Sequence, residues 1–306
     1  MKSFFTFLKL FIIYFIIKIR GSSSDTGGDD GELELAPTVA DCCPSRTLEI
    51  ARAIRTRKES ELVKLLGTAG QYWSNFAETE SDRDSADRKP CIYAFSGAAY
   101  QGLQVSDCGA AAVSYLQKNL RIIDPLYGLL RPLDRIQPYR LEMASKNVLL
   151  GDQKKIKLAD FWKDAITERL SQELQDRDPS PSSSSILLNL ASDEYAAAVS
   201  EAGLPKATAF VKVVFWQEGR VISVHAKRAR GLMARYLAEK EATTLDDVRA
   251  FAEEGYSFVA SKSDEQTLVF DRPKPPPKKN AKSNATKKRA ASSNSKSRNK
   301  KQKRSR

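Results

Sequence analysis

Four basic side chains gather within the short segment "HAKRARGLMARY", residues 225–236. They are Lys227, Arg228, Arg230 and Arg235. From residue 220 to residue 236 the chain carries five Lys or Arg and no Asp or Glu. Cations without interleaved acidic residues favour phosphate binding over a merely solvated helix face. The segment therefore predicts one wall of a basic, phosphate-binding groove, with Arg131 and Arg140 facing it.

A second group of polar side chains occupies the proline-containing segment "LYGLLRPLDRIQPYRLEM", residues 126–143. Prolines prevent one continuous helix, so an irregular scaffold is expected here. The candidate pocket residues on it are Tyr127, Asp134, Tyr139 and Glu142. Two interpretations stay open: the side chains line a polar pocket, or they hold the shape of the loop through the pairs Arg131–Asp134 and Arg140–Glu142.

The stretch "ILLNLASDEY" predicts a buried strand over residues 186–190 that leads into a helix. Ligands of α/β folds bind at the carboxyl ends of strands, and helix N-termini favour anions. Further pocket candidates are Asn189, Ser192, Glu194 and Tyr195, together with Tyr100.

A carboxyl group with a raised pKa beside Arg and Tyr is a typical general acid. The alternative function is therefore an enzyme that binds a nucleotide or nucleobase in a closed polar pocket, with Glu194 or Glu142 as general acid or base. DNA binding without turnover is favoured over this alternative.

Metal and thiol chemistry find little support in the composition. The chain has four Cys and a single His, His225, and no C-x-x-C spacing. These residues cannot assemble a zinc site. We therefore predict no cofactor and no direct metal site.

Apolar periodicity outlines the elements that must position these residues. It predicts two helices within residues 46–66, helices over 110–120 and 158–174, and strands over 91–95 and 267–270. A hairpin is predicted with its turn at Glu218-Gly219 and its second strand running to Lys227. This mixture indicates the α+β class, as a single compact mixed-sheet domain with flanking helices over residues 45–272.

The two ends of the chain differ from this domain. Residues 1–20 predict a hydrophobic leader or anchor, whose apolar run 4–19 is short for a spanning helix and is the only expected membrane contact. Residues 21–44 form an acidic Gly/Ser-rich linker. Residues 273–306 carry 14 Lys or Arg and no Asp or Glu, which leaves a net charge of −2 for residues 1–272. They predict a disordered polybasic tail that attracts nucleic acid or directs nuclear import.

The motifs named above also carry a family resemblance. "YQGL", "LYGLLRPLDRIQPYRLEM", "NLASDEY", "AKRARGLMARY", "GYSF" and "LVF" resemble, in order and spacing, the YaaA family of peroxide-stress proteins over residues 91–143 and 186–270. The resemblance implies a YaaA-type α+β domain, a cytosolic role in limiting hydrogen peroxide damage, and binding of double-stranded or distorted DNA. It also implies a positively charged cleft and a helix-hairpin-helix element. The matching polar positions are Tyr100, Tyr127, Arg131, Asp134, Tyr139, Arg140, Glu142, Asn189, Ser192, Glu194, Tyr195, Lys227, Arg228, Arg230 and Arg235.

Two segments depart from the pattern of that family. Members begin with a strand of the type "LISPAKTL", and the hydrophobic leader and acidic linker stand in its place here. "IDPLYG", residues 123–128, stands where "LSGLYG" is usual. A leader keeps organelle targeting or secretion open and the basic tail keeps the nucleus open, whereas the resemblance implies the cytosol.

Overall fold

The structure is a computed structural model of the whole chain, and it describes residues 14–20, 43–66, 73, 88–150, 155–177 and 185–274. For residues 14–20 only the backbone is described. The predictions for the linker 21–44 and the tail 273–306 fall almost entirely outside these residues. All elements named below belong to the unit Met1–Pro273.

One mixed sheet organises this unit, in the strand order β4-β3-β1-β6-β7-β9-β8. The strands are β1 (Tyr14–Arg20), β3 (Leu120–Asp124), β4 (Gly128–Leu130), β6 (Ser185–Asn189), β7 (Thr208–Gln217), β8 (Ser257–Phe258) and β9 (Thr267–Arg272). The pairs β6–β7 and β7–β9 are parallel, and the remaining pairs are antiparallel. A sheet of both kinds with separate helices confirms the predicted α+β class.

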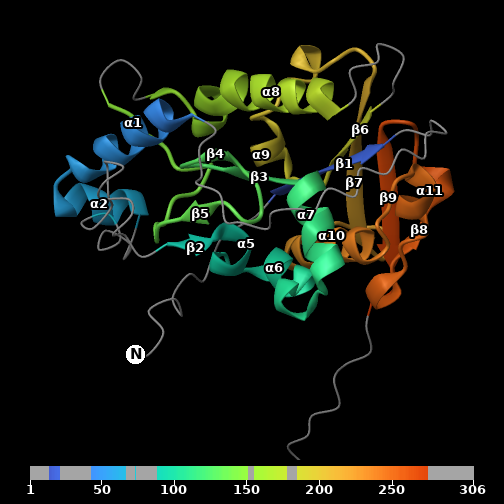
Figure 1. Ribbon diagram of the computed structural model, residues 1–306. Helices are drawn as coiled ribbons and strands as arrows, with labels where there is room; N and C mark the ends of the chain where they lie inside the picture. The colour runs from blue at the N-terminus through green and yellow to red at the C-terminus, as the bar shows by residue number, and fades with distance from the viewer. Residues whose placement is uncertain are drawn as a thin grey trace, which may run out of the picture. The chain divides into compact units, whose positions relative to one another are not determined.

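Strand β1 differs from the expectation for the N-terminal segment. Residues 14–20 lie within the stretch that predicts a leader or anchor, yet they pair antiparallel with β3 on one side and β6 on the other. A short apolar run fits a buried strand as well as a leader, and periodicity alone does not separate the two. Pairing on both edges gives this segment a central place in the sheet (Figure 1).

Helices lie around the sheet, with α8 along the top of the view and α5 and α6 at the bottom (Figure 1). The described helices are α1 (Pro44–Arg55), α2 (Glu59–Leu66), α5 (Cys91–Ala94), α6 (Ala98–Leu103), α7 (Ala110–Asn119), α8 (Leu158–Arg177), α9 (Asp193–Ala196), α10 (Ser223–Glu239) and α11 (Leu245–Arg249). A small second sheet pairs β2 (Lys89–Pro90) with β5 (Arg135–Ile136). Among the helices of the described segments, none has the length and apolar character needed to cross a membrane.

Two predicted strands are helical in the structure. The strand expected over residues 91–95 is helix α5, a single turn packed in the core. The hairpin turn at Glu218-Gly219 is confirmed, with positive φ at both residues, but its second strand is limited to one bridge between Gln217 and Arg220. Helix α10 starts at Ser223, and its buried face begins at Ala226, whereas Val221, Ile222 and Val224 after the turn are exposed. The alternation read as a strand was therefore wrong.

Two glycines let helices α6 and α10 cross in backbone contact. A methyl group added at Gly231 would stand 1.7 Å from the carbonyl oxygen of Ala99, and one at Gly102 would stand 2.1 Å from that of Arg228. No other residue type allows this approach. The crossing fixes where the basic side chains of α10 point.

Candidate functional site

The basic segment forms the N-terminal half of α10, and the helix distributes its cations over two faces. Residues 223, 226, 227 and 230 follow helical spacing and line one cavity. Arg228 and Arg235, seven residues apart, lie on another face toward α6 and η2 (Val105–Asp107). The single basic wall expected from the sequence is therefore divided in two.

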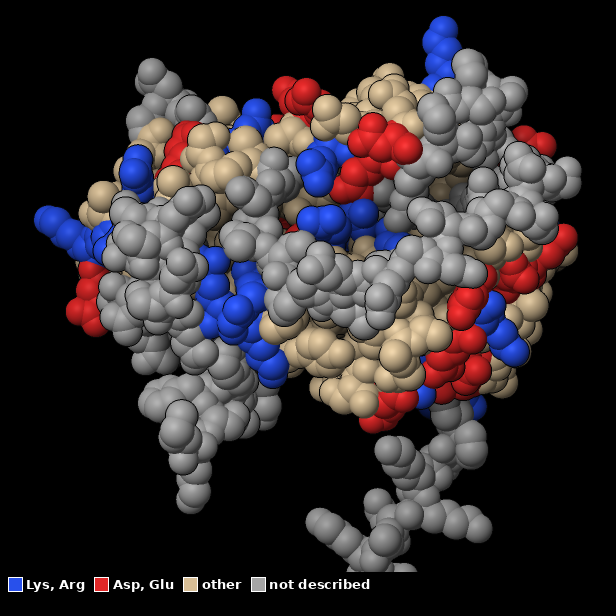
Figure 2. Space-filling view, in the orientation of Figure 1, with Lys and Arg blue, Asp and Glu red and all other residues tan. Residues whose placement is uncertain are grey.

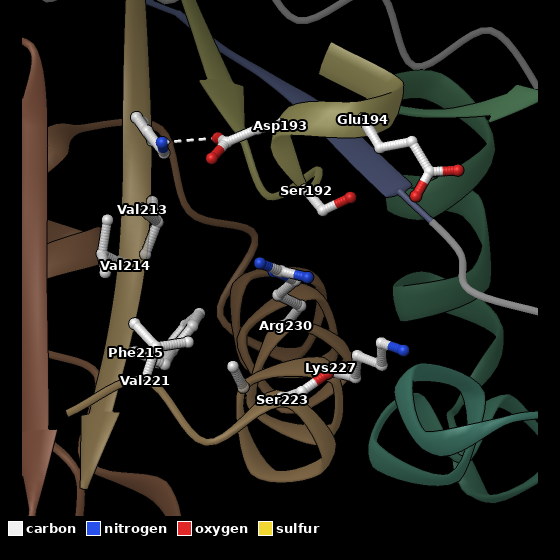
Figure 3. A pocket seen from close by; sticks show the side chains of 12 residues that line it. Ser192, Asp193, Glu194, Val213, Val214, Phe215, Val221, Ser223, Lys227 and Arg230 are labelled. Carbon is white, nitrogen blue, oxygen red and sulfur yellow. Dashed lines mark hydrogen bonds and ion pairs between the residues drawn. The ribbon is translucent and has the colours of Figure 1, made fainter. Parts of the chain in front are cut away.

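The cavity lies between β7 and α10 and has a volume of about 350 Å³ (Figure 3). Its lining combines aliphatic side chains from β7 and the following turn with polar side chains from α9 and α10. The lining residues are Ser192, Asp193, Glu194, Lys212, Val213, Val214, Phe215, Val221, Ser223, Ala226, Lys227 and Arg230. Such a volume falls within the range of small-molecule pockets.

The two cations on the other face have acidic partners, one distant in sequence and one on α10 itself. Arg228 contacts Glu254 at 2.7 Å and donates to the carbonyl of Gln101 at 2.9 Å. Arg235 donates to Glu239 at 2.7 Å. The fold thus supplies the acidic partner of Arg228, which links α10 to α6 and to Glu254, whereas Arg235 pairs with the next acidic residue of its own helix and lies 4.0 Å from Asp107.

The proline-containing segment contains both ion pairs of its second interpretation. Arg131 lies 3.7 Å from Asp134, and Arg140 lies 4.0 Å from Glu142. The buried Asp134 also accepts a hydrogen bond from the backbone of Arg131 at 2.8 Å, which closes the turn. These pairs hold the loop together.

Glu194 and Lys227 influence one another at the mouth of the cavity. Burial raises the pKa of Glu194, a hydrogen bond from the backbone of Ala144 opposes this, and nearby Glu142 raises it further. Burial and the neighbouring charge of Arg230 lower the pKa of Lys227, while Glu194 and Glu142 counteract the shift. Burial thus disfavours the charged form of both groups.

The four tyrosines predicted as pocket residues are all buried and pack in the interior of the protein. Tyr100, Tyr127, Tyr139 and Tyr195 are each at most 7% exposed. Tyr127 and Tyr139 meet edge to face at 5.5 Å, and the Tyr139 hydroxyl donates to Asp124. The Tyr195 hydroxyl accepts from the backbone of Met143 at 3.3 Å. These residues position the loops around the cavity from inside.

Asn189 also serves local structure, because its side-chain oxygen accepts from the backbone of Ala191 at 2.8 Å. It lines a different cavity of about 390 Å³, which shares only Asp193 and Lys212 with the first. Neither of these two cavities is lined by Asn189, Arg140 and Glu194 together.

Asp124 and Lys212 were missed by sequence reasoning. Asp124 is buried at the end of β3, where its carboxylate accepts from the backbones of Leu126 and Tyr127, both at 2.8 Å. Lys212 is a cation in the middle of β7, within the apolar run "FVKVVF". A charged residue inside so apolar a strand was the available signal.

The surface charge is separated on the face shown in Figure 2. Lys and Arg side chains gather near the middle of this face, and Asp and Glu gather at its right, toward α11 and β8.

Within the segments that the structure describes, no group of three or more His, Cys, Asp or Glu is placed to hold a metal ion. Burial and the nearby charges of Asp134 and Asp124 raise the pKa of Cys91 well above its usual value, which keeps this thiol protonated.

Known proteins of similar sequence identify the family. A family model described as peroxide stress protein YaaA matches residues 30–262. The chain belongs to this YaaA family. A UPF0246 protein of Chromobacterium violaceum is 38% identical over 232 residues, which cover 73% of this chain and 86% of the relative. A UPF0246 protein of Idiomarina loihiensis is 37% identical over 230 residues, which cover 74% of this chain and 85% of the relative. A UPF0246 protein of Aliivibrio fischeri is 36% identical over 234 residues, which cover 74% of this chain and 87% of the relative.

Membership in the YaaA family supports a role for this protein in peroxide stress. The resemblance seen in the sequence motifs is thereby confirmed. At one departure from the YaaA pattern, "IDPLYG", the structure places Asp124 in a buried turn. Trp162 of α8 covers this turn by donating to the carbonyl of Pro125 at 2.9 Å.

Proposed function

We propose that this YaaA-family protein binds DNA during the response to hydrogen peroxide and limits oxidative DNA damage, with any lowering of free iron being indirect. One observation carries the proposal: Lys227 and Arg230 lie one helical turn apart at the same cavity. Arg230 is close enough to lower the pKa of Lys227. Two cations held together repel one another, and a bound phosphate relieves that repulsion.

The paired arginines refine which residues would contact DNA. Lys227 has no carboxylate within ion-pair distance in the described part of the chain. Arg228 and Arg235, by contrast, would have to leave Glu254 and Glu239 to reach a phosphate. Lys227 is therefore a proposed phosphate contact of α10, and Arg230 is the second because it lines the same cavity one helical turn away.

Replacing Lys227 and Arg230 together by glutamine should weaken binding to a fluorescein-labelled DNA duplex roughly tenfold for each lost contact. Loss of two phosphate contacts should also reduce the salt slope by about 1.8. Fluorescence anisotropy at several salt concentrations measures both quantities. The full chain and a chain ending at Pro273 should both be titrated, because the basic tail binds phosphates without selectivity.

The matched control is Arg249→Gln with Lys262→Gln, which removes the same charge from exposed positions on α11 and η6 (Ala260–Lys262). This control should leave affinity within about twofold. Equal effects of the two double variants in the chain ending at Pro273 would contradict the proposed contacts. If the chain ending at Pro273 did not bind DNA, the DNA binding of the full chain would be assigned to the basic tail alone.

A second candidate function rests on Glu194, whose pKa burial raises at the cavity. In this alternative the cavity binds a nucleotide or nucleobase and Glu194 or Glu142 transfers a proton. Chromatography of deoxynucleotides after incubation with the protein tests it. Turnover that is lost in Glu194→Gln would support the enzyme, and unchanged nucleotides at every pH would exclude it for those substrates.

A further inference from the structure

One ion pair lies where the two cavities beside β7 meet. Lys212, in the middle of β7, contacts Asp193 at the start of α9, with 2.6 Å between Nζ and Oδ1. Both residues line both cavities. The dashed line in Figure 3 marks this contact beside the larger group of polar side chains. Lys212 thus lies at the junction of two cavities, and its ammonium group is paired with a carboxylate of the same chain.

The pair is weak enough to open. Its side chains are 42% and 85% exposed for Lys212 and Asp193. Exposed ion pairs contribute only about 0.2–1 kcal/mol, because water competes for both charges. An arriving anion can therefore displace Asp193 from Lys212.

Ser192 supplies a second donor to the same cavity. It is the N-cap residue of α9, yet its side chain makes no capping hydrogen bond. Its Oγ is buried and has no hydrogen-bond partner among the residues that the structure describes. Buried hydroxyl groups are nearly always paired, so an unpaired one that lines a cavity is available to bond a molecule in that cavity. Figure 3 shows the Arg230 side chain extending from α10 toward the loop that carries Ser192.

Together these groups match the chemistry of a phosphate ester. An ammonium, a guanidinium and a hydroxyl all donate to phosphate oxygens, and charged donors form the stronger hydrogen bonds. The aliphatic wall formed by Val213, Val214 and Val221 would cover the less polar part of the same molecule. A carboxylate and a phosphate compete for the same lysine because both are anionic oxygen acceptors.

We propose that Lys212, Ser192 and Arg230 bind one phosphate group in this cavity, and that Asp193 occupies Lys212 until the phosphate displaces it. This inference rests on the proposed DNA-binding function for one source of the phosphate, the DNA backbone. The other source is a free nucleotide. Asp193 acts in either case as a built-in competitor, so its removal strengthens binding.

The test uses the full chain and four variants: Asp193→Asn, Lys212→Met, the two combined, and Asp246→Asn. Asp246→Asn is the matched control, because it breaks an ion pair with Arg249 at 2.7 Å whose side chains are 87% and 41% exposed. Both single Asp variants change the net charge by the same amount. Affinity is measured by anisotropy for a labelled duplex and by calorimetry for deoxyadenosine monophosphate, and thermal denaturation confirms that each variant is folded.

Asp193→Asn should strengthen binding of at least one probe about threefold to tenfold, whereas Asp246→Asn should change it less than about twofold. Lys212→Met should weaken binding by about tenfold, and the combined variant should bind no better than Lys212→Met. Tighter binding confined to the duplex identifies the DNA backbone as the source, and an effect on the nucleotide identifies a free nucleotide.

Equal effects of Asp193→Asn and Asp246→Asn, or unchanged binding by Lys212→Met, would overturn the inference while leaving DNA binding intact. If no variant binds either probe, the inference and the proposed function fail together.

Discussion

Gly231→Ala should destabilise the protein by about 3 kcal/mol or more, the largest effect expected of any single methyl group. The added carbon would lie 1.7 Å from the Ala99 carbonyl oxygen and 2.7 Å from the backbone nitrogen of Leu103. Both are backbone atoms of α6 that cannot rotate away, so α6 and α10 must separate. Separation would also displace the cations of α10.

Thermal denaturation followed by circular dichroism measures this effect. A loss of about 3 kcal/mol lowers the Tm of a domain of this size by roughly 6–12 °C. Gly109→Ala is the control, because a methyl group at Gly109 meets nothing within 4 Å. If Gly231→Ala melted together with Gly109→Ala, the backbone contact between α6 and α10 would not exist as described.

Asp124→Asn should change how stability depends on pH. Burial raises the pKa of Asp124 from 3.8 to about 6, although hydrogen bonds from Tyr139, Tyr127 and Leu126 lower it. Between these two values the folded protein binds more protons than the unfolded chain, so the contribution of Asp124 falls as pH rises toward and through 6. Over the whole interval, Asp124 lowers the free energy of unfolding by about 3 kcal/mol.

Asparagine is neutral at every pH and can keep the acceptor that the Leu126 and Tyr127 backbones use. The free energy of unfolding of Asp124→Asn, relative to that of the natural protein, should therefore rise by about 3 kcal/mol between acid and neutral pH. Urea unfolding across this interval measures the difference. Tyr139→Phe tests the cause, since it removes a hydrogen bond that favours the carboxylate and should shift the pH window upward. A constant difference between Asp124→Asn and the natural protein would show that the carboxylate is not desolvated.

The secondary structure could be predicted where periodicity was long and unbroken. The helix over residues 158–174 is confirmed as α8, and the strands over 186–190 and 267–270 are confirmed as β6 and β9. Prediction failed at short apolar segments, where α5 replaced a strand. A run of four or five apolar residues fits either conformation, and only its neighbours in the fold decide.

The electrostatics of the site could not be predicted from neighbouring residues. Arg228 lacks an acidic residue nearby in sequence but meets Glu254, which is 26 positions away. Lys212 and Asp193 meet across 19 positions because β6 and β7 run parallel and bring α9 beside the middle of β7. The composition of residues 220–236 suggested a cation cluster without acidic partners, but Arg228 pairs with the distant Glu254 and Arg235 pairs with Glu239, three residues beyond that segment.

The sequence by itself determined the α+β class, the family and the long helices and strands, because these depend on local periodicity and on motifs that are continuous in the chain. The tertiary structure alone decided that residues 14–20 form a central strand, that Gly231 permits a helix crossing, and that Lys227, Arg230 and Lys212 share a cavity. Hydrogen bonding, close packing and charge pairing act over a few ångströms in space, and the separation of residues along the chain does not reveal those distances.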